Sequence, residues 1–436
     1  MRTRKMNKAF YITAAELAQL GFENIPEELL SAKHLIYSSP ATLAFNSPGA
    51  QGFGVKRAGL AIPGSVMLLV SPGCCGRNTT MQSRLCGYQD RFFYLLLDDT
   101  DIVTGRHLTK IPQAVKEVYD FCQEKPSAVM ICITCVDALL GTDMERVSRK
   151  CEELAGVPVV PCYMYALTRE KKLPPMAAVR KAVYSLLKPQ KRHPDAMNIL
   201  GFFAPLNDDS EIYELLTKAG IRHIREISRC ESFEEYEKMS QANFNLVLNS
   251  EARYAAQQME ETLGLPYIEM MRMYHIDKIH NQYMSLANAI GVTFDDTQHY
   301  ARTKKAIDDF KAQYGELIFA IGEFLNADSF ELAWALLSYG FSVSEIYGTV
   351  GQRNFVFVKA IAKLSPDTKI FSNLSPTMLD YEPSGKRIDV CIGNDAGYYH
   401  ADVPTVDWNE ERQPFGYAGL RLLFEKLDRA LKGAEK

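Results

Sequence analysis

The chain has 436 residues, which is too many for a single hydrophobic core, so two to four domains are expected. Hydrophobic residues make up 47% of the sequence and charged residues 23%, an ordinary balance for a folded protein. The formal net charge of −4 gives no general attraction to nucleic acid or to an anionic membrane surface, so neither is an expected partner.

The beginning of the chain predicts a cytoplasmic protein. Residues 1–10 are basic and lack the apolar run of an export signal, and residues 11–22 have the pattern of a helix. No uninterrupted apolar run reaches the length of about 18 residues that a membrane span needs, because Pro63 and Gly64 cut the most apolar stretch. Cytoplasmic thiols stay reduced, which disfavours a disulfide framework for the ten cysteines.

From residue 64 onward one pattern recurs: an apolar strand, a short polar or glycine-rich loop, an amphipathic helix and another strand. Short apolar strands that alternate with helices predict mainly parallel sheets covered on both faces, which is the doubly wound, Rossmann-like α/β class. The predicted strands cover residues 64–70, 127–134, 157–161, 197–203, 221–227, 244–249, 265–270, 316–324, 341–348, 367–373 and 387–394, with helices over 135–156, 210–220, 250–264 and 330–340.

Two stretches interrupt this pattern and predict domain boundaries. Residues 186–197 are rich in proline and charge, and residues 300–315 form a polar helix. We therefore expect three Rossmann-like α/β domains over residues 1–190, 191–312 and 313–436.

Three cysteines, Cys74, Cys75 and Cys86, gather in a glycine-rich stretch that is predicted to be a loop. Cys74 and Cys75 come directly after one apolar strand, and Cys135 comes directly after the next one, at the start of a helix. The carboxyl ends of parallel strands meet at one edge of a sheet, so these thiols are expected at the same edge. The helix amino end at Cys135 favours a thiolate, and thiolates are the ligands of iron–sulfur clusters.

Zinc binding and simple packing are alternative roles for the cysteines. A zinc site usually takes its ligands from tight C-x-x-C pairs, and Cys132 and Cys135 have this spacing, but Cys132 is predicted to lie inside a buried strand. Packing is the expected role of the cysteines on helical or strand patterns, whereas a functional role stays open for the two that follow strands. The first group is Cys122, Cys132, Cys151 and Cys230, and the second is Cys162 and Cys391.

The cysteine elements resemble those of the nitrogenase component 1 family. "SPGCCG" resembles the family's G-P-x-G-C element, with Pro72 followed three residues later by Cys75. "ITCVDALLGTDMERV" resembles its T/E-C-x-x-x-L/I-I-G-D-D-I element, with Cys135 in register. "DDTDIVTGRHLTKIPQAV", "GVPVVPC" and "ARYAAQQMEETLGLPYIEM" resemble further stretches, so the likeness spans most of the chain and includes the three-domain layout.

This resemblance implies an iron–sulfur cluster, [4Fe–4S] or larger, at a subunit interface. In the family three cysteines of each subunit hold half of the cluster, and the matching residues here are Cys75, Cys86 and Cys135. Cys74 is an alternative to Cys75, and Cys74 or Cys162 is an alternative third ligand if Cys86 is not one. Three thiolates leave a four-ligand cluster incomplete, so we expect a homodimer or a heterodimer with a related subunit. An ATP-dependent iron–sulfur reductase protein is the second expected partner.

The sequence also departs from the catalytic nitrogenase subunit, which ligates its iron–molybdenum cofactor with a middle-domain cysteine and a carboxy-terminal histidine. Here "NLVLNSEARYAAQQMEE" has leucine, asparagine and serine where that cysteine would fall, and "VDWNEERQPFGYAG" carries no histidine. We therefore expect a nitrogenase-like protein without an iron–molybdenum cofactor, and not a true catalytic subunit.

Two main hypotheses follow for the function. The first is an oxidoreductase component that accepts electrons from the ATP-dependent iron protein and reduces an unidentified substrate. The alternative is a scaffold or carrier for metallocofactor assembly without turnover of its own; a third is a partner subunit that only completes a cluster. A nicotinamide or flavin dehydrogenase is disfavoured because no strand is followed by a G-x-G-x-x-G motif, and a periplasmic-type binding protein because no export signal is present.

Four polar residues are candidates for further roles in such a reductase. His275 and His280 are candidate proton donors, although solvated positions near a helix start are the expected alternative. Arg106 and His107 are candidates for holding an anionic substrate, and a plain surface turn is the alternative for them.

Overall fold

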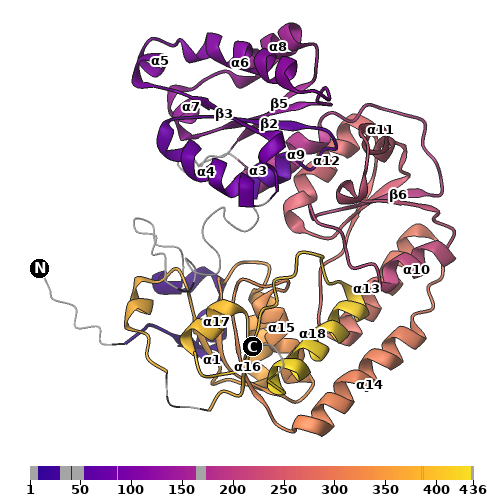
Figure 1. The fold of residues 1–436 in the computed structure, drawn as a ribbon. Helices are drawn as coiled ribbons and strands as arrows, with labels where there is room; N and C mark the ends of the chain where they lie inside the picture. Colours follow the sequence, from indigo (N-terminus) through magenta and orange to yellow (C-terminus); the bar gives the residue numbers. More distant parts are fainter. Residues whose placement is uncertain are drawn as a thin grey trace, which may run out of the picture. The chain divides into compact units, whose positions relative to one another are not determined.

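A computed structural model describes residues 8–29, 41, 54–85, 87–163, 173–383, 385 and 387–433. Within these residues the strands form three mainly parallel sheets, and helices lie against their faces (Figure 1). This confirms the predicted α/β class. The chain divides into two compact units. The two-sheet unit holds residues 49–205 and 220–271, and the one-sheet unit holds residues 1–48, 206–219 and 272–436.

The first sheet belongs to the two-sheet unit, and its strands are β2 (Val66–Ser71), β3 (Phe92–Leu96), β4 (Val129–Ile133) and β5 (Val159–Tyr163). They lie in the order β3-β2-β4-β5, and every neighbouring pair is parallel. The helices of this part are α3 (Gly54–Gly59), α4 (Gly73–Leu85), α5 (Asp99–Val103), α6 (His107–Phe121), α7 (Cys135–Leu140), α8 (Met144–Ala155) and α9 (Pro175–Tyr184), with a 3-10 turn, η4 (Gln89–Arg91).

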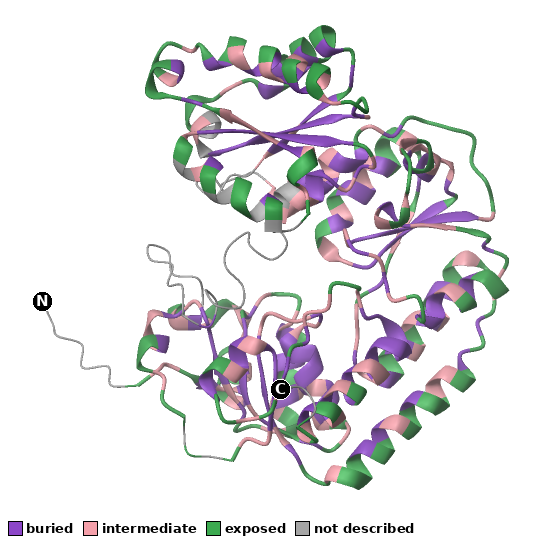
Figure 2. Ribbon diagram, viewed as in Figure 1, coloured by how far each residue is buried: buried purple, intermediate pink, exposed green. Residues whose placement is uncertain are grey.

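The first sheet is buried on both faces because alternate side chains of its apolar strands point to opposite sides. Leu68 and Val70 join one core with residues of α6 and α8, whereas Met67 and Leu69 join the other with residues of α9. Figure 2 shows most of the strands buried and the outer faces of the helices exposed, whereas β3 at one side of the first sheet is mostly half-buried.

The second sheet also belongs to the two-sheet unit and is parallel, with the order β7-β6-β8-β9. Its elements are β6 (Ala196–Leu200), β7 (His223–Arg225), β8 (Phe244–Val247), β9 (Tyr267–Glu269), α11 (Phe233–Glu237), α12 (Arg253–Leu263) and the 3-10 turns η5 (Ile227–Arg229), η6 (Lys238–Gln241) and η7 (Ser250–Ala252). Leu200 and Val247 share a core with Val179 and Val183 of α9, so one continuous core joins the first two sheets.

The third sheet forms the centre of the one-sheet unit, with the order β1-β12-β11-β10-β13-β14. Its strands are parallel except that β1 runs antiparallel to β12. They are β1 (Ile12–Thr13), β10 (Ile318–Ile321), β11 (Ser342–Tyr347), β12 (Lys369–Phe371), β13 (Val390–Ile392) and β14 (Thr405–Val406). The helices are α1 (Ala14–Leu20), α10 (Glu211–Lys218), α13 (Ile276–Ile290), α14 (Thr297–Tyr314), α15 (Ser329–Ser338), α16 (Phe355–Leu364), α17 (Asn394–Tyr399) and α18 (Gly416–Leu431), with 3-10 turns η1 (Phe22–Asn24), η2 (Glu27–Leu29) and η8 (Pro376–Asp380).

The buried carboxylate of Glu211 ties α10 to the one-sheet unit. One of its oxygens accepts the Tyr283 hydroxyl at 2.6 Å and the backbone N–H of Tyr417 at 2.6 Å, and the other accepts the N–H of Ala418 at 2.9 Å. Gly416 has φ +63°, and a Cβ there would lie 2.0 Å from Glu211 Oε1, so only glycine allows this contact. The start of α18 is therefore capped by a residue about 200 positions earlier in the chain.

The compact units divide the chain differently from the domain boundaries expected after residues 190 and 312. Each expected range contains most of one sheet, but β1 joins the third sheet, and α10, α13 and α14 lie in the one-sheet unit. The three-domain boundaries stay a prediction. None of the helices in the described ranges has the length and apolar character that a membrane crossing requires.

Candidate functional site

The candidate site lies at the carboxyl edge of the first sheet, where the strand order reverses. β2 and β4 are direct neighbours, and Val70 near the end of β2 pairs with Ile133 at the end of β4. β2 continues into α4, which begins at Gly73, and β4 continues into α7, which begins at Cys135. Ligands of doubly wound sheets bind at such a topological switch point, so the backbone brings two cysteine-bearing helix starts to the place where a ligand is expected.

The four candidate ligands differ in how far the structure describes them. Cys75 lies in the first turn of α4 and is half-buried. Cys86 lies outside the described residues, and so do the side chains of Cys74 and Cys135. In the described part of the chain no group of three or more His, Cys, Asp or Glu side chains is placed to hold a metal ion, but that part does not contain the complete predicted ligand set.

The stretch that contains Cys74 and Cys75 is a helix, not the predicted loop. α4 starts two residues after β2 and reaches Leu85. Gly76 packs directly on the ring of Tyr94 in β3, where a Cβ would lie 1.9 Å from the ring. The Tyr94 hydroxyl donates to the carbonyl of Ser71 at 3.1 Å, which holds the ring in place. Close packing on β3 therefore outweighs the low helix propensity of the glycines.

The helix predicted over residues 135–156 is two helices, α7 and α8. Gly141 between them has φ +64°, which a continuous helix does not allow. Asp143 then caps α8, because its side chain accepts the N–H of Arg146 at 3.0 Å. As a result α7 is short, and it ends at this edge of the sheet with Leu139 and Leu140 exposed.

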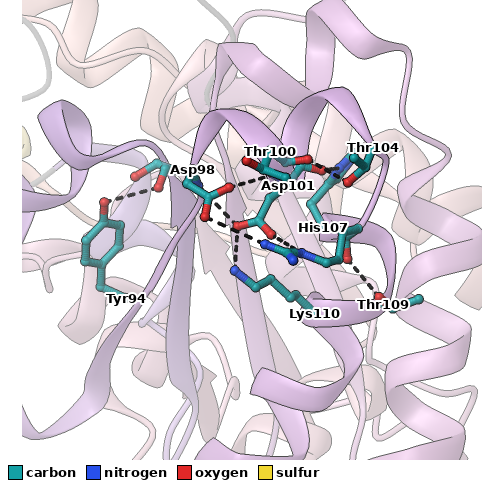
Figure 3. A network of polar contacts seen from close by, with 10 residues as sticks. Tyr94, Asp98, Thr100, Asp101, Thr104, His107, Thr109 and Lys110 are labelled. Carbon is teal, nitrogen blue, oxygen red and sulfur yellow. Dashed lines mark hydrogen bonds and ion pairs between the residues drawn. The ribbon is translucent and has the colours of Figure 1, made fainter.

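A buried carboxylate organises the turn between α5 and α6 (Figure 3). Asp101 accepts the Nζ–H of Lys110 at 2.5 Å, the Nε–H of Arg106 at 2.7 Å and the N–H of Asp98 at 3.2 Å. The hydrogen bond from Lys110 is the largest cause that holds the pKa of Asp101 well below its usual range. His107 is buried, with Nδ1 3.1 Å from the carbonyl oxygen of Asp101.

This network changes the interpretation of Arg106 and His107. The Arg106 guanidinium is bound to Asp101 and also lies 3.7 Å from Asp98. His107 begins α6 and is buried against the same segment. Arg106 and His107 therefore connect α5 and α6. Arg106 lies in the exposed turn between the two helices, as the surface-turn alternative expects, whereas His107 is buried. A role for them in holding an anionic substrate stays a prediction.

The remaining cysteines are mostly core residues. Cys132, Cys151, Cys162 and Cys391 are fully buried, which confirms the packing role expected for Cys132 and Cys151. Burial raises the pKa of the Cys151 and Cys391 thiols to about 12 and that of Cys162 well above its usual value. Burial thus opposes the thiolate form that metal binding needs, and this weakens Cys162 as an alternative ligand.

The two candidate histidines anchor α13 within the one-sheet unit. His275 precedes the helix and stacks on Trp334, with ring centroids 4.3 Å apart, and burial lowers its pKa. His280 Nδ1 lies 2.9 Å from buried Asp296, which also accepts the Tyr417 hydroxyl at 2.6 Å. His280 keeps 40% of its side chain exposed, as the solvated alternative expects, whereas His275 is half-buried against Trp334. A role of either histidine as a proton donor stays a prediction.

Sequence reasoning missed the residue at the switch point of the third sheet, between β10 and β13. Oδ2 of buried Asp395 accepts the N–H of Glu323 at 2.7 Å and the Nδ2–H of Asn373 at 2.9 Å. Gly322 and Gly393 line the other oxygen so closely that a Cβ would lie 2.0 and 2.8 Å from it. Burial raises the pKa of Asp395. A side chain of the protein thus fills the crevice, and the only sequence signal is a glycine after each strand.

The comparisons with known proteins agree with the fold and with the family that the sequence resembles. The model of the nitrogenase component 1 type oxidoreductase family matches residues 50–432. The nitrogenase iron-molybdenum cofactor biosynthesis protein NifE of Nostoc sp. is 26% identical over 353 residues, which are 77% of this chain and 72% of that protein. The nitrogenase molybdenum-iron protein alpha chain of Methanosarcina barkeri is 27% identical over 225 residues, which are 50% of this chain and 41% of that protein.

A solved structure of nitrogenase Cp1 at pH 6.5 superimposes with a TM-score of 0.70 at 15% identity. The superposition covers 92% of this chain and 94% of that chain. At this identity the likeness concerns the fold alone.

Proposed function

Because this chain belongs to the nitrogenase component 1 type oxidoreductase family, we propose that it is a scaffold that holds an iron–sulfur metallocluster during assembly and then passes it on. Two observations support this alternative over a substrate-reducing enzyme: a similarity to one class of relative and a difference from the catalytic subunit. The protein named for cofactor biosynthesis aligns with 77% of the chain, whereas the alpha chain aligns with 50%. The cysteine and the histidine that hold the cofactor in a catalytic subunit also have no counterpart in the matching stretches of this sequence.

The switch point of the first sheet carries this proposal. It places the backbones of Cys75 and Cys135 at the ends of neighbouring strands. The donor set fits the group, because thiolates are the usual ligands of iron–sulfur clusters. Both cysteines lie at helix amino ends, where the helix dipole favours negative charge. Cys86 is the proposed third ligand.

A partner subunit completes the proposed site, since three thiolates do not fill a four-ligand set. Exposed apolar side chains near the site support an interface: Leu96 at the end of β3 is 55% exposed, Val103 at the end of α5 85%, and Leu139 at the end of α7 69%. We call these three residues the carboxyl-edge patch. Apolar groups gathered at one edge are typical of a surface that a partner covers.

The proposal is tested by the iron content of cysteine variants purified without oxygen. Cys75→Ala and Cys135→Ala should lose most of the iron and sulfide while the α/β units stay folded, because the mutated groups lie at a sheet edge. Cys151→Ala is the matched control, since this thiol lies in a core on α8 and should cost only packing energy, on the order of 1 kcal/mol. Equal iron in all three variants would rule out Cys75 and Cys135 as ligands. Stoichiometric zinc in place of iron would rule out the iron–sulfur cluster.

A second measurement separates the scaffold from an enzyme. The iron-loaded chain should transfer its cluster to a cluster-free acceptor subunit. It should not catalyse substrate-dependent electron flow when an ATP-dependent iron–sulfur reductase and ATP are added. Sustained turnover with that reductase would support the oxidoreductase instead.

A further inference from the structure

The switch point of the second sheet is occupied by a buried cation, Arg180. The order β7-β6-β8-β9 places the reversal between β6 and β8. Gly201 follows β6, and a Cβ on Gly201 would lie 2.7 Å from the backbone nitrogen of Asn249 in the segment after β8. Arg180 reaches this point from α9, and only 6% of its side chain is exposed.

Protein groups hold the Arg180 guanidinium in one orientation. Nε and Nη2 donate to the carbonyl of Gly201 at 3.3 and 2.9 Å, and Nη1 donates to the carbonyl of Met176 at 3.1 Å. The guanidinium also lies over the ring of Phe203, 4.8 Å from its centroid. These contacts are neutral, so they orient the positive charge without compensating it.

The anion that compensates this charge comes from the surface. Nη1 of Arg180 lies 2.8 Å from Oε2 of Glu251, whose side chain is 46% exposed. Burial is the main influence on Arg180 and lowers its pKa, and the charge of Glu251 opposes that change. A buried cation requires an anion, because an unpaired buried charge is strongly destabilising. Glu251, in contrast, lies on a short 3-10 turn with nearly half of its side chain exposed, so water can solvate its carboxylate in place of Arg180.

We propose that Arg180 and Glu251 form an anion-exchange site, in which Glu251 occupies the place of an anionic, sulfide-bearing metal cluster until that cargo arrives. The identity of the cargo rests on the proposed function, whereas the site itself rests on the guanidinium and its exposed counter-ion. Arginine suits this role because its charge is permanent and its N–H groups bind anions in a fixed geometry. When Glu251 turns outward, Nη1 bonds an acceptor atom of the cargo, and the guanidinium keeps its contacts with Gly201, Met176 and Phe203.

Binding of tetrathiomolybdate, a small anionic metal sulfide, tests this site in the full-length chain. Glu251→Gln removes the competing charge but keeps an oxygen that accepts the Nη1–H bond. It should bind tetrathiomolybdate at least about tenfold more tightly than the unmodified chain, since a hydrogen bond to a charged group is worth roughly that factor. The probe should also raise the melting temperature of this variant.

Two further variants make the result specific. Arg180→Gln combined with Glu251→Gln leaves no buried charge and should lose the binding gained by Glu251→Gln alone. Glu269→Gln removes the counter-ion of Arg253, a more exposed arginine in the same unit, and should not strengthen binding. The proposal is overturned if Glu251→Gln binds no more tightly than the unmodified chain, if the double variant keeps the gain, or if molybdate binds in place of tetrathiomolybdate.

The outcome is independent of the cysteine test. If Cys75 and Cys135 hold iron but the Glu251→Gln variant binds tetrathiomolybdate no more tightly, only the anion-site proposal is refuted. If the anion binds at Arg180 but the chain holds no iron, only the cluster-scaffold proposal is refuted.

Discussion

A parallel sheet whose strand order reverses leaves a crevice at the reversal, and a few side chains decide what that crevice holds. The first sheet places Cys75 and Cys135 there, the second places Arg180 and the third places Asp395. A carboxyl wedged between two glycines leaves no room for a phosphate, which agrees with the absence of a dinucleotide motif. Three sheets of one fold class therefore present three different chemistries at equivalent positions.

Glu331 is a buried carboxyl whose titration should be visible in the stability of the one-sheet unit. It accepts the backbone N–H groups of Tyr274 at 2.9 Å and His275 at 3.0 Å, and burial raises its pKa from 4.5 to about 8. Between these values the folded state holds a proton that the unfolded state has lost. The free energy of unfolding should therefore fall as pH rises from about 5 to 8, with a slope of up to about 1.4 kcal/mol per pH unit.

Glu331→Gln tests this expectation by urea unfolding at a series of pH values. The amide oxygen accepts the same N–H groups without titrating, so the pH slope should shrink and stability above pH 8 should rise. Glu425→Gln, at an exposed position of α18, should leave the slope unchanged. If the slope survives in Glu331→Gln, another group carries it.

At the scale of single elements, the stability that α4 contributes should depend on glycine at position 76 but not at position 73. Gly76→Ala places a methyl group 1.9 Å from the ring of Tyr94, which its hydroxyl bond holds in place. We expect destabilisation of about 1–3 kcal/mol despite the better helix propensity of alanine, because overpacking dominates. A Cβ at Gly73 would lie 3.8 Å from the nearest side chain, so Gly73→Ala should be tolerated. Chemical denaturation of both variants measures the difference, and equal stability would refute the close contact.

The sequence predicts the elements whose signals are local. The apolar strands were identified because parallel strands buried on both faces are almost continuously apolar. α4 was missed because its fold depends on the contact of Gly76 with Tyr94, which no local pattern reveals. The break between α7 and α8 depends on Gly141, and a single glycine in a sequence does not by itself indicate whether a helix is interrupted there. The two-residue strand β1 is too short to produce any periodicity.

In the candidate site, too, only the residues whose signals are local were predictable from the sequence. Each cysteine position was predicted because it depends on one strand end, and the register of β2 and β4 then brings two of them to neighbouring positions. Arg180 and Asp395 were not identified, because an arginine in an amphipathic helix and an aspartate after a strand have the same local pattern as surface residues. They are distinguished only by contacts between segments that are distant in the chain, such as the close approach of Gly201 to the backbone of Asn249.

At the scale of the whole molecule, long-range contacts divide the chain in a way that composition does not predict. A single core joins the first two sheets, so they form one unit despite the charged stretch between them. Glu211 caps the start of α18, and this contact assigns residues 206–219 to the one-sheet unit. Buried polar contacts as well as apolar cores therefore decide which segments of the chain belong to each unit.

The carboxyl-edge patch leads to a prediction about assembly. If a second chain completes the cluster site, the exposed side chains of Val103 and Leu139 become buried in the interface, and a charge at either position would lose its hydration there. Val103→Asp and Leu139→Asp should weaken the dimer at least about 30-fold, the factor that corresponds to the loss of an interface hot spot.

Phe121→Asp is the matched control, because Phe121 is 78% exposed but ends α6, at the opposite edge of the first sheet from the cysteines. Helix α6 follows β3 and returns the chain toward the start of β4, so its last turn lies away from the carboxyl ends of the strands. Sedimentation without oxygen should give a dimer for the unmodified chain and for Phe121→Asp, and monomers that retain less iron for the two patch variants. A monomeric unmodified chain that keeps its full iron content would show that one subunit supplies every ligand.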